Sequence, residues 1–467
     1  MEKKQVVIIG AGISGLLACK YCLSKGFNPM VFESQSDIGG VWAKTSRTTR
    51  LQSFKGSFQF SDFPWPSSVT QDYPTQHQLL NYLRSYATRF DLMNHIQFNS
   101  VVKGIEYDGP PTPSRETFPQ GKWKVTVENS QSTKVHDADF VILCVGRFKD
   151  FPNIPEFAPG AGPEVFRGKM IHSMEYAAMD HQEAEEFIKG KRVVVVGFQK
   201  QGLDIAMECS SLNSFVMISG KENPCTILYR NDRWKLPDFS PWGIPLSYLY
   251  FNRFSELLVH KPGEGFLLGL LATILSPLRW GISKLVETHV KKKSPLAKFD
   301  MVPKCSFSKD LRSGLVSTMP EDFFNRVETG SILLKRSPGF SFYKEGILND
   351  GENKPTRADI VILATGFKGI QKLQSIFMSQ DLRDFIAPSP DSRVPLYREC
   401  IPPRIPQVAI IGFSESISNL FTSEMRCRWV VELLDGTFKL PSIKEMEKDI
   451  SNWDEYMKQS AGEYHQR

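Results

Sequence analysis

The chain has 467 residues, of which 41% are hydrophobic and 23% charged, as in globular proteins of two or three domains. Its formal net charge is +6, but no long basic stripe is interleaved with aromatic residues, which argues against nucleic-acid binding. Eight cysteines are too few for a disulfide scaffold, and the N-terminus has the features of neither a signal peptide nor a transit peptide. We therefore expect a protein of the reducing cytoplasm.

The first elements form a βαβ pattern. Residues 6–9 are a continuous apolar run that ends at a glycine, as in a strand buried on both faces. Residues 13–24 carry apolar side chains at helical spacing, and residues 29–33 form a second apolar run. Parallel pairing with a right-handed crossover follows for such a unit.

The turn between the first strand and the helix predicts a dinucleotide site. Gly10, Gly12 and Gly15 have the spacing G-x-G-x-x-G, which permits a tight turn, close approach of the backbone to a pyrophosphate and close helix packing. Ser14 lies in the same turn, where the helix N-terminus offers N–H groups to phosphate oxygens. Glu33 ends the second strand, where a carboxylate accepts hydrogen bonds from ribose and repels a 2′-phosphate. We therefore expect FAD or NAD here rather than NADP.

Two adjacent glycines follow the predicted ribose-binding acid. Gly39 and Gly40, followed by Val41 and Trp42, allow the backbone to pass close to a ligand as long as FAD. The alternative is a simple turn before a core tryptophan. We count all four residues as cofactor-binding candidates.

Cys19 and Cys22 form a C-x-x-C pair by count. They lie within the first predicted helix, and the sequence has no second pair at metal-binding spacing. We interpret them as ordinary helix residues rather than a redox pair or half of a zinc site.

The next stretch mixes irregular and regular structure. Residues 58–66 are aromatic and irregular, and residues 78–90 have a helical pattern. Residues 123–128 and 140–145 are predicted strands, the second of which ends at a glycine.

The opening signal recurs in the middle of the chain with a degraded glycine set. Residues 192–196 are a β-branched run, residues 203–212 a predicted helix and residues 226–230 a predicted strand. The cofactor-binding candidates of this turn keep the first and third glycines but replace the second, and they are Gly197, Gln199, Lys200 and Gly202. A side chain at the second position crowds a pyrophosphate unless it points away or hydrogen-bonds to it.

Arginines replace the acid at the end of the second strand of this lobe. Arg230 follows the strand, and Arg233 comes three residues later. A guanidinium can bind a 2′-phosphate in a bidentate manner, so we expect NADPH rather than NADH. The alternative for either arginine is a solvated surface charge.

Residues 241–293 are unusually aromatic and apolar and end in Lys291, Lys292 and Lys293. We expect a pair of helices forming a hydrophobic wall over a substrate entrance. The alternatives are peripheral membrane contact through this face and plain core. The longest apolar stretch, residues 266–278, contains Pro277 and is too short to span a bilayer.

Two further strand-to-glycine signals occur at residues 360–366 and 408–412, and a helix is predicted at 419–434. We expect an α/β fold of two Rossmann-like dinucleotide-binding domains. The first part of the FAD domain spans residues 1–160. The inserted NADPH domain spans 161–335, with an apolar helical insert at about 240–295, and residues 336–467 complete the FAD domain.

These features together resemble the class B flavin-containing monooxygenase family. Residues 166–176 (FRGKMIHSMEY) match its fingerprint F-x-G-x-x-x-H-x-x-x-(Y/F), and residues 364–367 match its A-T-G-(Y/F) motif. The resemblance implies that Thr365 and Gly366 lie near the cofactors, with the threonine bracing the hinge between lobes. For His172 it invites a general-base role, although we favour packing or hydrogen bonding.

Two short segments look most like the plant branch that N-hydroxylates pipecolic acid, namely residues 51–53 (LQS) and 421–426 (FTSEMR). Animal and bacterial members have an asparagine where Gln52 stands, a residue implied to steady the nicotinamide and the oxygenated flavin. We take Gln52 as the catalytic candidate, because glutamine keeps the amide but moves it by one methylene.

The resemblance implies an NADPH- and O₂-dependent enzyme that passes one oxygen atom from C4a-hydroperoxyflavin to a nucleophilic nitrogen of a small amine or amino acid. S-oxygenation of a thioether and a catalytically impaired, flavin-binding paralogue are the alternatives. A disulfide reductase shares the two-lobe plan, but its paired cysteines would have to face the flavin. We expect a cytoplasmic enzyme, with a peripheral position at the endoplasmic reticulum membrane as the alternative.

Overall fold

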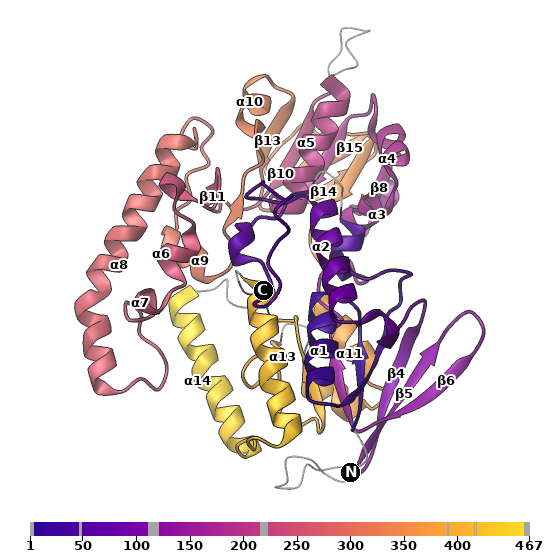
Figure 1. The fold of residues 1–467 in the computed structure, drawn as a ribbon. Helices are drawn as coiled ribbons and strands as arrows, with labels where there is room; N and C mark the ends of the chain where they lie inside the picture. The colour runs from indigo at the N-terminus through magenta and orange to yellow at the C-terminus, as the bar shows by residue number, and fades with distance from the viewer. Residues whose placement is uncertain are drawn as a thin grey trace. The chain divides into compact units, whose positions relative to one another are not determined.

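The computed structural model describes residues 4–45, 49–110, 121–214, 223–389, 392–414, 416 and 418–461. The chain forms two compact units (Figure 1). Unit 1 combines Met1–Phe151 with Phe367–Arg467, and unit 2 is the continuous stretch Pro152–Gly366.

Unit 1 is built on a five-stranded parallel sheet with the strand order β18-β7-β1-β2-β3. Its strands are β1 (Gln5–Ile9), β2 (Asn28–Phe32), β3 (Ile96–Gln97), β7 (Phe140–Leu143) and β18 (Val408–Ile410). Its α-helices are α1 (Ile13–Ser24), α2 (Gln76–Arg89), α11 (Gly369–Ile376), α12 (Gln380–Ile386), α13 (Asn419–Asp435) and α14 (Ile443–Ala461). Short 3₁₀ helices lie at Gly40–Lys44, Lys55–Ser57 and Met93–His95.

Both faces of this sheet are buried, which explains the continuous apolar run in β1. Alternate residues of a strand point to opposite faces. Val6 and Ile8 join a core with α1, α2 and α13, and Figure 1 shows α1 beside α13. Val7 and Ile9 join a second core with α11 and a three-stranded antiparallel sheet.

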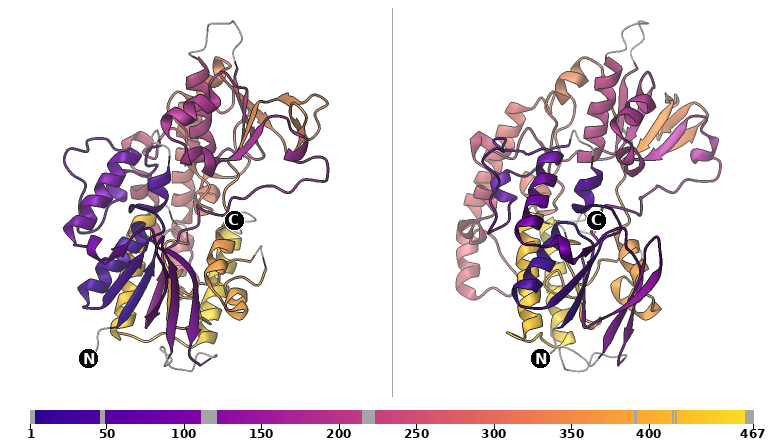
Figure 2. Two further views of the ribbon diagram at one scale, coloured as in Figure 1. Left: turned by 90° about the vertical axis from the view of Figure 1, so that its right-hand side faces the viewer. Right: turned by 45° about the vertical axis from the view of Figure 1, so that its right-hand side comes forward.

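That antiparallel sheet consists of β4 (Val101–Asp108), β5 (Lys122–Glu128) and β6 (Thr133–Ala138). Figure 2 shows it as a layer beside the parallel sheet of the same unit. Trp123 and Val125 of β5 fill the space between the two sheets. The strand predicted at 123–128 therefore exists but does not belong to the nucleotide-binding sheet.

Unit 2 repeats the parallel plan with the strand order β13-β10-β9-β17-β8. Its strands are β8 (Lys169–His172), β9 (Val193–Val196), β10 (Cys225–Tyr229), β13 (Ile332–Arg336) and β17 (Ile360–Leu363). The smaller strands are β11 (Lys235–Leu236), β12 (Ser317–Thr318), β14 (Phe340–Tyr343), β15 (Gly346–Asn349) and β16 (Thr356–Arg357).

The predicted start of the C-terminal part at residue 336 is wrong. β17 pairs with β8 and β9 in the sheet of unit 2, and β14 and β15 pack on the same unit through Phe342 and Ile347. The run 360–363 resembles any buried parallel strand, so its hydrophobicity could not show which of two sheets it joins. The return to unit 1 comes at Phe367.

The helices of unit 2 are α3 (Ser173–Ala178), α4 (His181–Ile188), α5 (Lys200–Ser214), α6 (Leu246–Tyr250), α7 (Arg253–Glu256), α8 (Phe266–Lys293), α9 (Phe307–Arg312) and α10 (Phe323–Glu328). Short 3₁₀ helices lie at Pro163–Val165 and Pro241–Gly243. Instead of the expected helix pair, the apolar insert contains one long helix, α8, preceded by the two short helices α6 and α7.

Pro277 lies inside α8 and does not end it, so the apolar stretch 266–278, expected to be too short to span a bilayer, is the first part of a helix of 28 residues. A proline at this position removes the hydrogen bond to the carbonyl of Thr273. The Ser276 hydroxyl donates to that carbonyl instead, at 3.0 Å. Among the described residues, α8 is the helix that is long and apolar enough to cross a membrane, by length and composition alone.

Candidate active site

The first and third glycines of the opening turn are required by backbone crowding. Gly10 has a φ of +102°, and a Cβ there would stand 2.6 Å from the carbonyl oxygen of Cys144, just after the neighbouring strand β7. A Cβ on Gly15 would stand 1.8 Å from the carbonyl oxygen of Gly10. Any side chain at either position would push α1 away from β1.

The second glycine has a different role, because it faces the loop with the paired glycines. Gly12 is the N-cap of α1, and a Cβ on it would lie 3.6 Å from the Cα of Gly40. The Gly39 N–H donates to the Ala11 carbonyl at 3.0 Å, which joins the two loops. The start of α1 therefore has only backbone around it, as a closely approaching pyrophosphate requires.

Glu33 lies where the predicted ribose contact requires it. Its side chain is buried, and it accepts a hydrogen bond from the Ala11 N–H at 2.7 Å and one from the Gln35 N–H at 2.9 Å. A carboxylate has about four lone-pair sites, so acceptor capacity is left for ribose hydroxyls. These two hydrogen bonds fix the Glu33 carboxylate beside the glycine turn.

The residues after Gly40 connect this turn to α2. Val41 is exposed, and Trp42 packs edge-on against Phe58 with the ring centroids 6.5 Å apart. The Trp42 carbonyl accepts from the side-chain amide of Gln76 at 2.7 Å. Trp42 therefore anchors the loop, and Val41 is the more accessible of the two.

The catalytic candidate Gln52 lies on a loop fixed from both sides. The backbone N–H of Leu51 donates to the Pro74 carbonyl at 2.8 Å, and Gln76 N–H donates to the Thr49 carbonyl at 3.0 Å. Gln52 itself is half-buried in unit 1. Its amide is thus carried by a braced segment of the unit that contains the first glycine turn.

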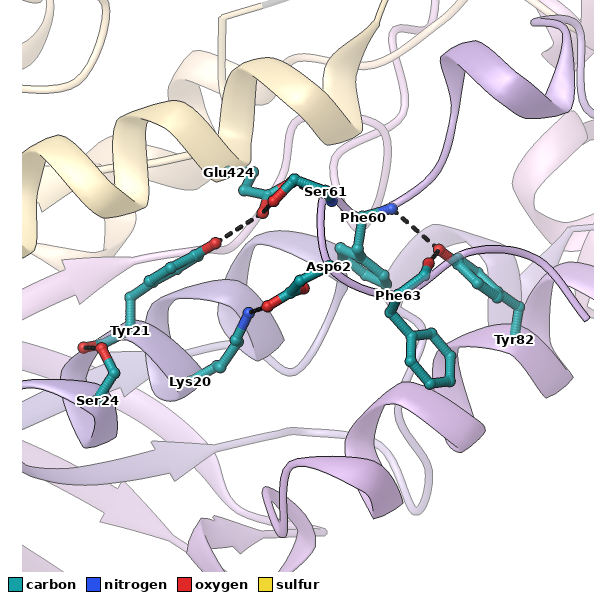
Figure 3. A network of polar contacts seen from close by, with 9 residues as sticks. All are labelled: Lys20, Tyr21, Ser24, Phe60, Ser61, Asp62, Phe63, Tyr82 and Glu424. Carbon is teal, nitrogen blue, oxygen red and sulfur yellow. Dashed lines mark hydrogen bonds and ion pairs between the residues drawn. The ribbon is translucent and has the colours of Figure 1, made fainter.

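A buried polar network holds the aromatic segment that follows (Figure 3). Glu424 on α13 is fully buried and accepts from the Tyr21 hydroxyl at 2.6 Å and from the Ser61 N–H at 3.0 Å. Lys20 on α1 forms an ion pair with Asp62. The segment is thereby tied to the helix that starts at the glycine turn.

Ser14 belongs to the same assembly. Its hydroxyl lies 3.3 Å from that of Ser423 on α13. A Cβ on Gly412 would stand 2.2 Å from the Ser14 hydroxyl oxygen, so glycine is needed there too. α13 supports the predicted phosphate-binding turn from behind, a link between residues 14 and 423 that the sequence does not reveal.

Unit 2 reproduces the glycine geometry of unit 1. Gly197 has a φ of +126°, and a Cβ on it would stand 2.3 Å from the Ala364 carbonyl oxygen. A Cβ on Gly202 would stand 2.4 Å from the Gly197 carbonyl oxygen. Both surviving glycines of the degraded motif thus meet the same backbone constraints as Gly10 and Gly15.

Gln199 takes the place of Gly12 at the start of α5. Its carbonyl accepts the Leu203 N–H at 3.0 Å, just as the Gly12 carbonyl accepts the Leu16 N–H at 3.0 Å. Its side-chain oxygen accepts from the ammonium of Lys235 at 3.2 Å. Lys235 therefore holds the glutamine side chain that was expected to crowd a pyrophosphate.

Lys235 is a buried cation that sequence reasoning missed. It also donates to the Ser317 hydroxyl at 2.8 Å and lies over the Phe198 ring. Burial lowers the pKa of Lys235 from 10.5 to about 7, although the nearby Asp310 opposes this shift. No local pattern signals the site, because Ser317 is distant in sequence.

The two arginines predicted for a 2′-phosphate differ in the structure. Arg230 follows β10, is exposed and forms no ion pair with any residue that the structure describes. Arg233 is instead paired with the buried Asp310 at 3.0 Å, and its side chain is only 9% exposed. The charge of Arg233 is thus balanced by a residue 77 positions away, whereas Arg230 has no such partner among the described residues; both stay predicted cofactor-binding residues.

Lys200, another cofactor-binding candidate, forms an ion pair with Asp204 one turn along α5. Arg336 at the end of β13 pairs with Asp232 at 2.8 Å. Both cations lie near the C-terminal edge of the sheet of unit 2, but each is already neutralised.

His172 has a structural role, as favoured above. Its Nδ1 accepts from the Met174 N–H at 3.1 Å and caps α3, and its Nε2 lies 3.0 Å from the Gly366 carbonyl oxygen. Burial lowers the pKa of His172, which favours the neutral ring required by this pairing. With both nitrogens engaged, the ring is not a general base.

Thr365 and Gly366 brace the two chain segments that connect the units. The Thr365 hydroxyl donates to the Asn153 carbonyl, and the Asn153 N–H donates to the Gly366 carbonyl at 2.9 Å. The Lys368 N–H donates to the Phe151 carbonyl at 2.7 Å. The two connecting segments are thus hydrogen-bonded to each other.

Cys19 and Cys22 have the burial expected of ordinary helix residues. Cys19 and Cys22 are buried in α1, and burial raises the pKa of Cys19 to about 12 and that of Cys22 further. Thiols of this kind are inert. Within the described residues, no group of three or more His, Cys, Asp or Glu side chains could hold a metal ion.

Comparison with known proteins decides the family. The family model described as flavin-binding monooxygenase-like matches residues 3–467. The chain belongs to this family. It is therefore a flavin-containing monooxygenase with FAD and NADP as cofactors, and the glycine turns of the two units fit dinucleotides.

Two curated relatives of this monooxygenase come from Arabidopsis thaliana. "Probable flavin-containing monooxygenase 1" is 38% identical over 459 residues, covering 96% of this chain and 85% of the relative. "Putative flavin-containing monooxygenase 2" is 35% identical over 455 residues, covering 95% and 88%.

Solved structures confirm the predicted fold class. OTEMO in complex with FAD and NADP superimposes with a TM-score of 0.65 and 17% identity, covering 96% of this monooxygenase and 89% of that chain. S-allyl-L-cysteine S-oxygenase from Allium sativum gives a TM-score of 0.59 at 17% identity, covering 99% and 85%.

Proposed function

We propose that this monooxygenase oxygenates the nitrogen of a small amine or amino acid, with pipecolate as the first candidate. One atom of O₂ becomes bonded to the substrate nitrogen and the other leaves as water. The two electrons come from NADPH, which becomes NADP⁺. FAD supplies the activation of O₂, and the protein positions the cofactor and excludes water.

The choice of nitrogen rests on the plant-branch pattern at residues 51–53 and 421–426. Both segments belong to unit 1. Ser423 contacts Ser14, and the Ser418 hydroxyl, just before α13, donates to the Ser57 carbonyl at 2.7 Å. These contacts support the proposal, because they join the second segment to the predicted flavin-binding turn and α13 to the loop that precedes the aromatic segment.

Gln52 is the proposed positioning group for the reaction. Its amide can donate and accept a hydrogen bond, as an asparagine would, from a position one methylene further out. The braced loop of Leu51 limits the places that this amide can reach. Holding water and peroxide away from the cofactor depends on such fixed contacts.

The test is NADPH oxidation by the purified holoenzyme, recorded beside hydrogen peroxide release, with pipecolate as substrate and mass spectrometry of the product. We expect substrate-dependent NADPH oxidation and a product heavier by one oxygen atom. Gln52→Leu should divert NADPH oxidation to hydrogen peroxide, whereas Gln52→Asn should keep product formation.

Two outcomes reject the proposal in different ways. A sulfoxide formed from a thioether, with amines unchanged, would assign the chain to S-oxygenation. A yellow protein that oxidises no NADPH with any amine or sulfide would mark an impaired paralogue.

A further inference from the structure

The side-chain amide of Gln199 has a fixed orientation. An ammonium group donates hydrogen bonds but cannot accept them. The atom that faces the Lys235 Nζ, at 3.2 Å, is therefore the amide oxygen, and the NH₂ group of Gln199 points away from the lysine. Gln199 is exposed, and no residue that the structure describes accepts a hydrogen bond from this NH₂ group. Two N–H donors are thus available to a ligand.

Gln199 lies where the turn of a dinucleotide site receives the pyrophosphate. It immediately precedes α5, and its carbonyl accepts from the Leu203 N–H at 3.0 Å. The N–H groups in the first turn of a helix have no partners within the helix and favour anions. Gly12 holds the equivalent position in unit 1, where glycine lets the backbone approach a pyrophosphate closely. Glutamine prevents that approach but offers side-chain donors in its place.

Lys235 is itself held in place by its neighbours. Its Nζ donates to the Ser317 hydroxyl at 2.8 Å, and the two residues are partners in the short parallel sheet of β11 and β12. The preceding Trp234 donates its backbone N–H to the Asp310 carboxylate at 3.0 Å and its indole N–H to the Cys305 carbonyl at 2.8 Å. Lys235 is only 1% exposed, so the lysine determines where the glutamine amide lies.

The carboxylates around Lys235 already have partners. Asp310 pairs with Arg233 at 3.0 Å, and Asp204 on α5 forms an ion pair with Lys200. Within the described ranges of the chain, no carboxylate forms an ion pair with Lys235. Burial therefore lowers the pKa of Lys235 to about 7, a shift that Asp310 opposes and Arg233 reinforces. The glutamine oxygen thus does not compete with a carboxylate for this ammonium group.

We propose that Gln199 donates its side-chain amide to the pyrophosphate of NADP(H), and that Lys235 is the positioning residue that orients the amide. The amide replaces the close backbone approach that a glycine permits in this turn. A hydrogen bond to a charged acceptor is about twice as strong as one between neutral groups, so the side-chain donor compensates for the lost approach. Unit 2 thus holds the pyrophosphate in a different way from unit 1.

The test is isothermal titration of the FAD-loaded protein with two ligands, NADP⁺ and adenosine 2′-monophosphate. The titrations are run at about pH 6.5, where most of the Lys235 side chains are protonated. Adenosine 2′-monophosphate carries the 2′-phosphate of NADP⁺ but has no pyrophosphate. Competition between the two ligands shows that they share one site. Both readouts are binding constants, so they do not depend on which substrate atom the enzyme oxygenates.

Gln199→Glu separates the two ligands. Glutamate keeps the length of the side chain and its contact with Lys235, but it presents an acceptor where glutamine presents donors. The affinity for NADP⁺ should fall at least about tenfold, because a hydrogen bond to a charged group is replaced by repulsion. The affinity for adenosine 2′-monophosphate should change less than about twofold.

The positioning role of Lys235 is tested with the same ligands. Lys235→Met should weaken the binding of NADP⁺ and leave that of adenosine 2′-monophosphate unchanged. In the Gln199→Leu background there is no amide to orient, so adding Lys235→Met should weaken NADP⁺ binding by less than about twofold. A lysine with a merely structural role would give the same loss in both backgrounds and for both ligands.

Gln201→Glu is the matched control. It adds the same charge two residues along the chain, where the Gln201 amide faces the Ser173 carbonyl at 3.5 Å rather than Lys235. Its affinity for NADP⁺ should fall by less than about threefold. Release of flavin at the same temperature in all variants shows that each is folded.

Three results would overturn the proposal. The first is an unchanged affinity of Gln199→Glu for NADP⁺. The second is an equal loss of affinity for both ligands, which would give Gln199 a structural role. The third is an equal loss of NADP⁺ affinity in Gln201→Glu, which would trace the effect to any added charge near the start of α5.

Discussion

At the residue scale, Lys235 shows how unit 2 tolerates a side chain at a position that normally requires glycine. The glutamine at that position does not swing freely, because a buried ammonium takes its oxygen. Lys235 lies two residues after Arg233, whose charge Asp310 neutralises. The loop is therefore shaped by residues outside the glycine motif.

Lys235→Met should weaken NADP⁺ binding about tenfold, because the freed Gln199 side chain then occupies the approach to the helix start. The double variant Lys235→Met/Gln199→Gly should recover most of the affinity. Isothermal titration of the FAD-loaded proteins with NADP⁺ measures both. An unchanged affinity of Lys235→Met for NADP⁺ would show that Lys235 does not position Gln199. If the double variant also binds NADP⁺ weakly, the loss comes from the missing charge of Lys235 rather than from Gln199.

The lowered pKa of Lys235 also predicts how stability depends on pH. In the unfolded chain this lysine keeps its proton up to about pH 10.4, whereas in the folded protein it loses the proton near pH 7. Between these two pH values the unfolded state binds more protons than the folded state. The contribution of Lys235 to the free energy of unfolding is therefore largest above the unfolded pKa and falls as the pH decreases towards 7. The slope is at most about 1.4 kcal/mol per pH unit.

Thermal melts should be recorded across this pH window. The melting midpoint of Lys235→Met should exceed that of the unmodified protein by the largest amount near pH 7. The gain should shrink as the pH rises. Lys292→Met, which removes an exposed lysine from the same unit, should show no such trend. If the melting midpoints of Lys235→Met and the unmodified protein change with pH in the same way, burial does not lower the pKa of Lys235 as described.

At the element scale, α13 supports α1, the helix predicted to bind the flavin, through one buried carboxylate. Glu424→Ala leaves the Tyr21 hydroxyl and the Ser61 N–H without their acceptor, at a cost of about 1–3 kcal/mol for each buried group. We expect the melting midpoint, followed by the release of flavin fluorescence, to fall by roughly 5 °C or more.

Glu432→Ala is the matched control on the same helix. Glu432 pairs with Lys25 at the surface, and exposed ion pairs contribute little. Its melting midpoint should stay close to that of the unmodified protein. Equal midpoints for the two variants would show that the network in Figure 3 does not hold the flavin-binding helix.

Local patterns predicted the elements well, but not their long-range partners. The helix expected at 13–24 has these bounds, and the one expected at 419–434 ends one residue later. For α2, the capping box of Thr75 and Gln78 marks a start two residues before the predicted one. The assignment of β17 to its sheet and the pairs Arg233–Asp310 and Lys235–Ser317 depend on contacts between distant residues, which no local period encodes.

The expectation that the apolar stretch 266–278 is too short to span a bilayer is corrected at this scale, because that stretch is only the first part of α8. A proline within a helical pattern is a reasonable stop signal. Here a neighbouring serine replaces the missing donor, and the helix continues for sixteen residues beyond the proline to Lys293. The length of α8, and with it the extent of its apolar face, was therefore underestimated.

At the scale of the whole molecule, the two glycine turns have the same geometry, and a single substitution should disable each one separately. Gly197→Ala forces a Cβ into the Ala364 carbonyl at a positive φ, so NADP⁺ binding and NADPH oxidation should be lost while the protein stays yellow. Gly10→Ala should yield colourless protein for the same reason in unit 1.

Absorbance at the flavin band and NADP⁺ titration check this pair of variants. Gly26→Ala is the control, because Gly26 also has a positive φ but has no atom within 4 Å of the added Cβ. A Gly197→Ala protein without flavin, or one that binds NADP⁺ normally, would contradict the assignment of FAD to unit 1 and NADP⁺ to unit 2.

The split of unit 1 along the chain has a consequence for synthesis on the ribosome. The nascent polypeptide can complete unit 2 as soon as Gly366 has emerged, but β7 lacks its neighbour β18 and α1 lacks α13 until residues near 435 follow. Domains fold as units, and contacts between distant residues form late. Flavin capture is thus expected only after α13 has been translated, later than the folding of unit 2.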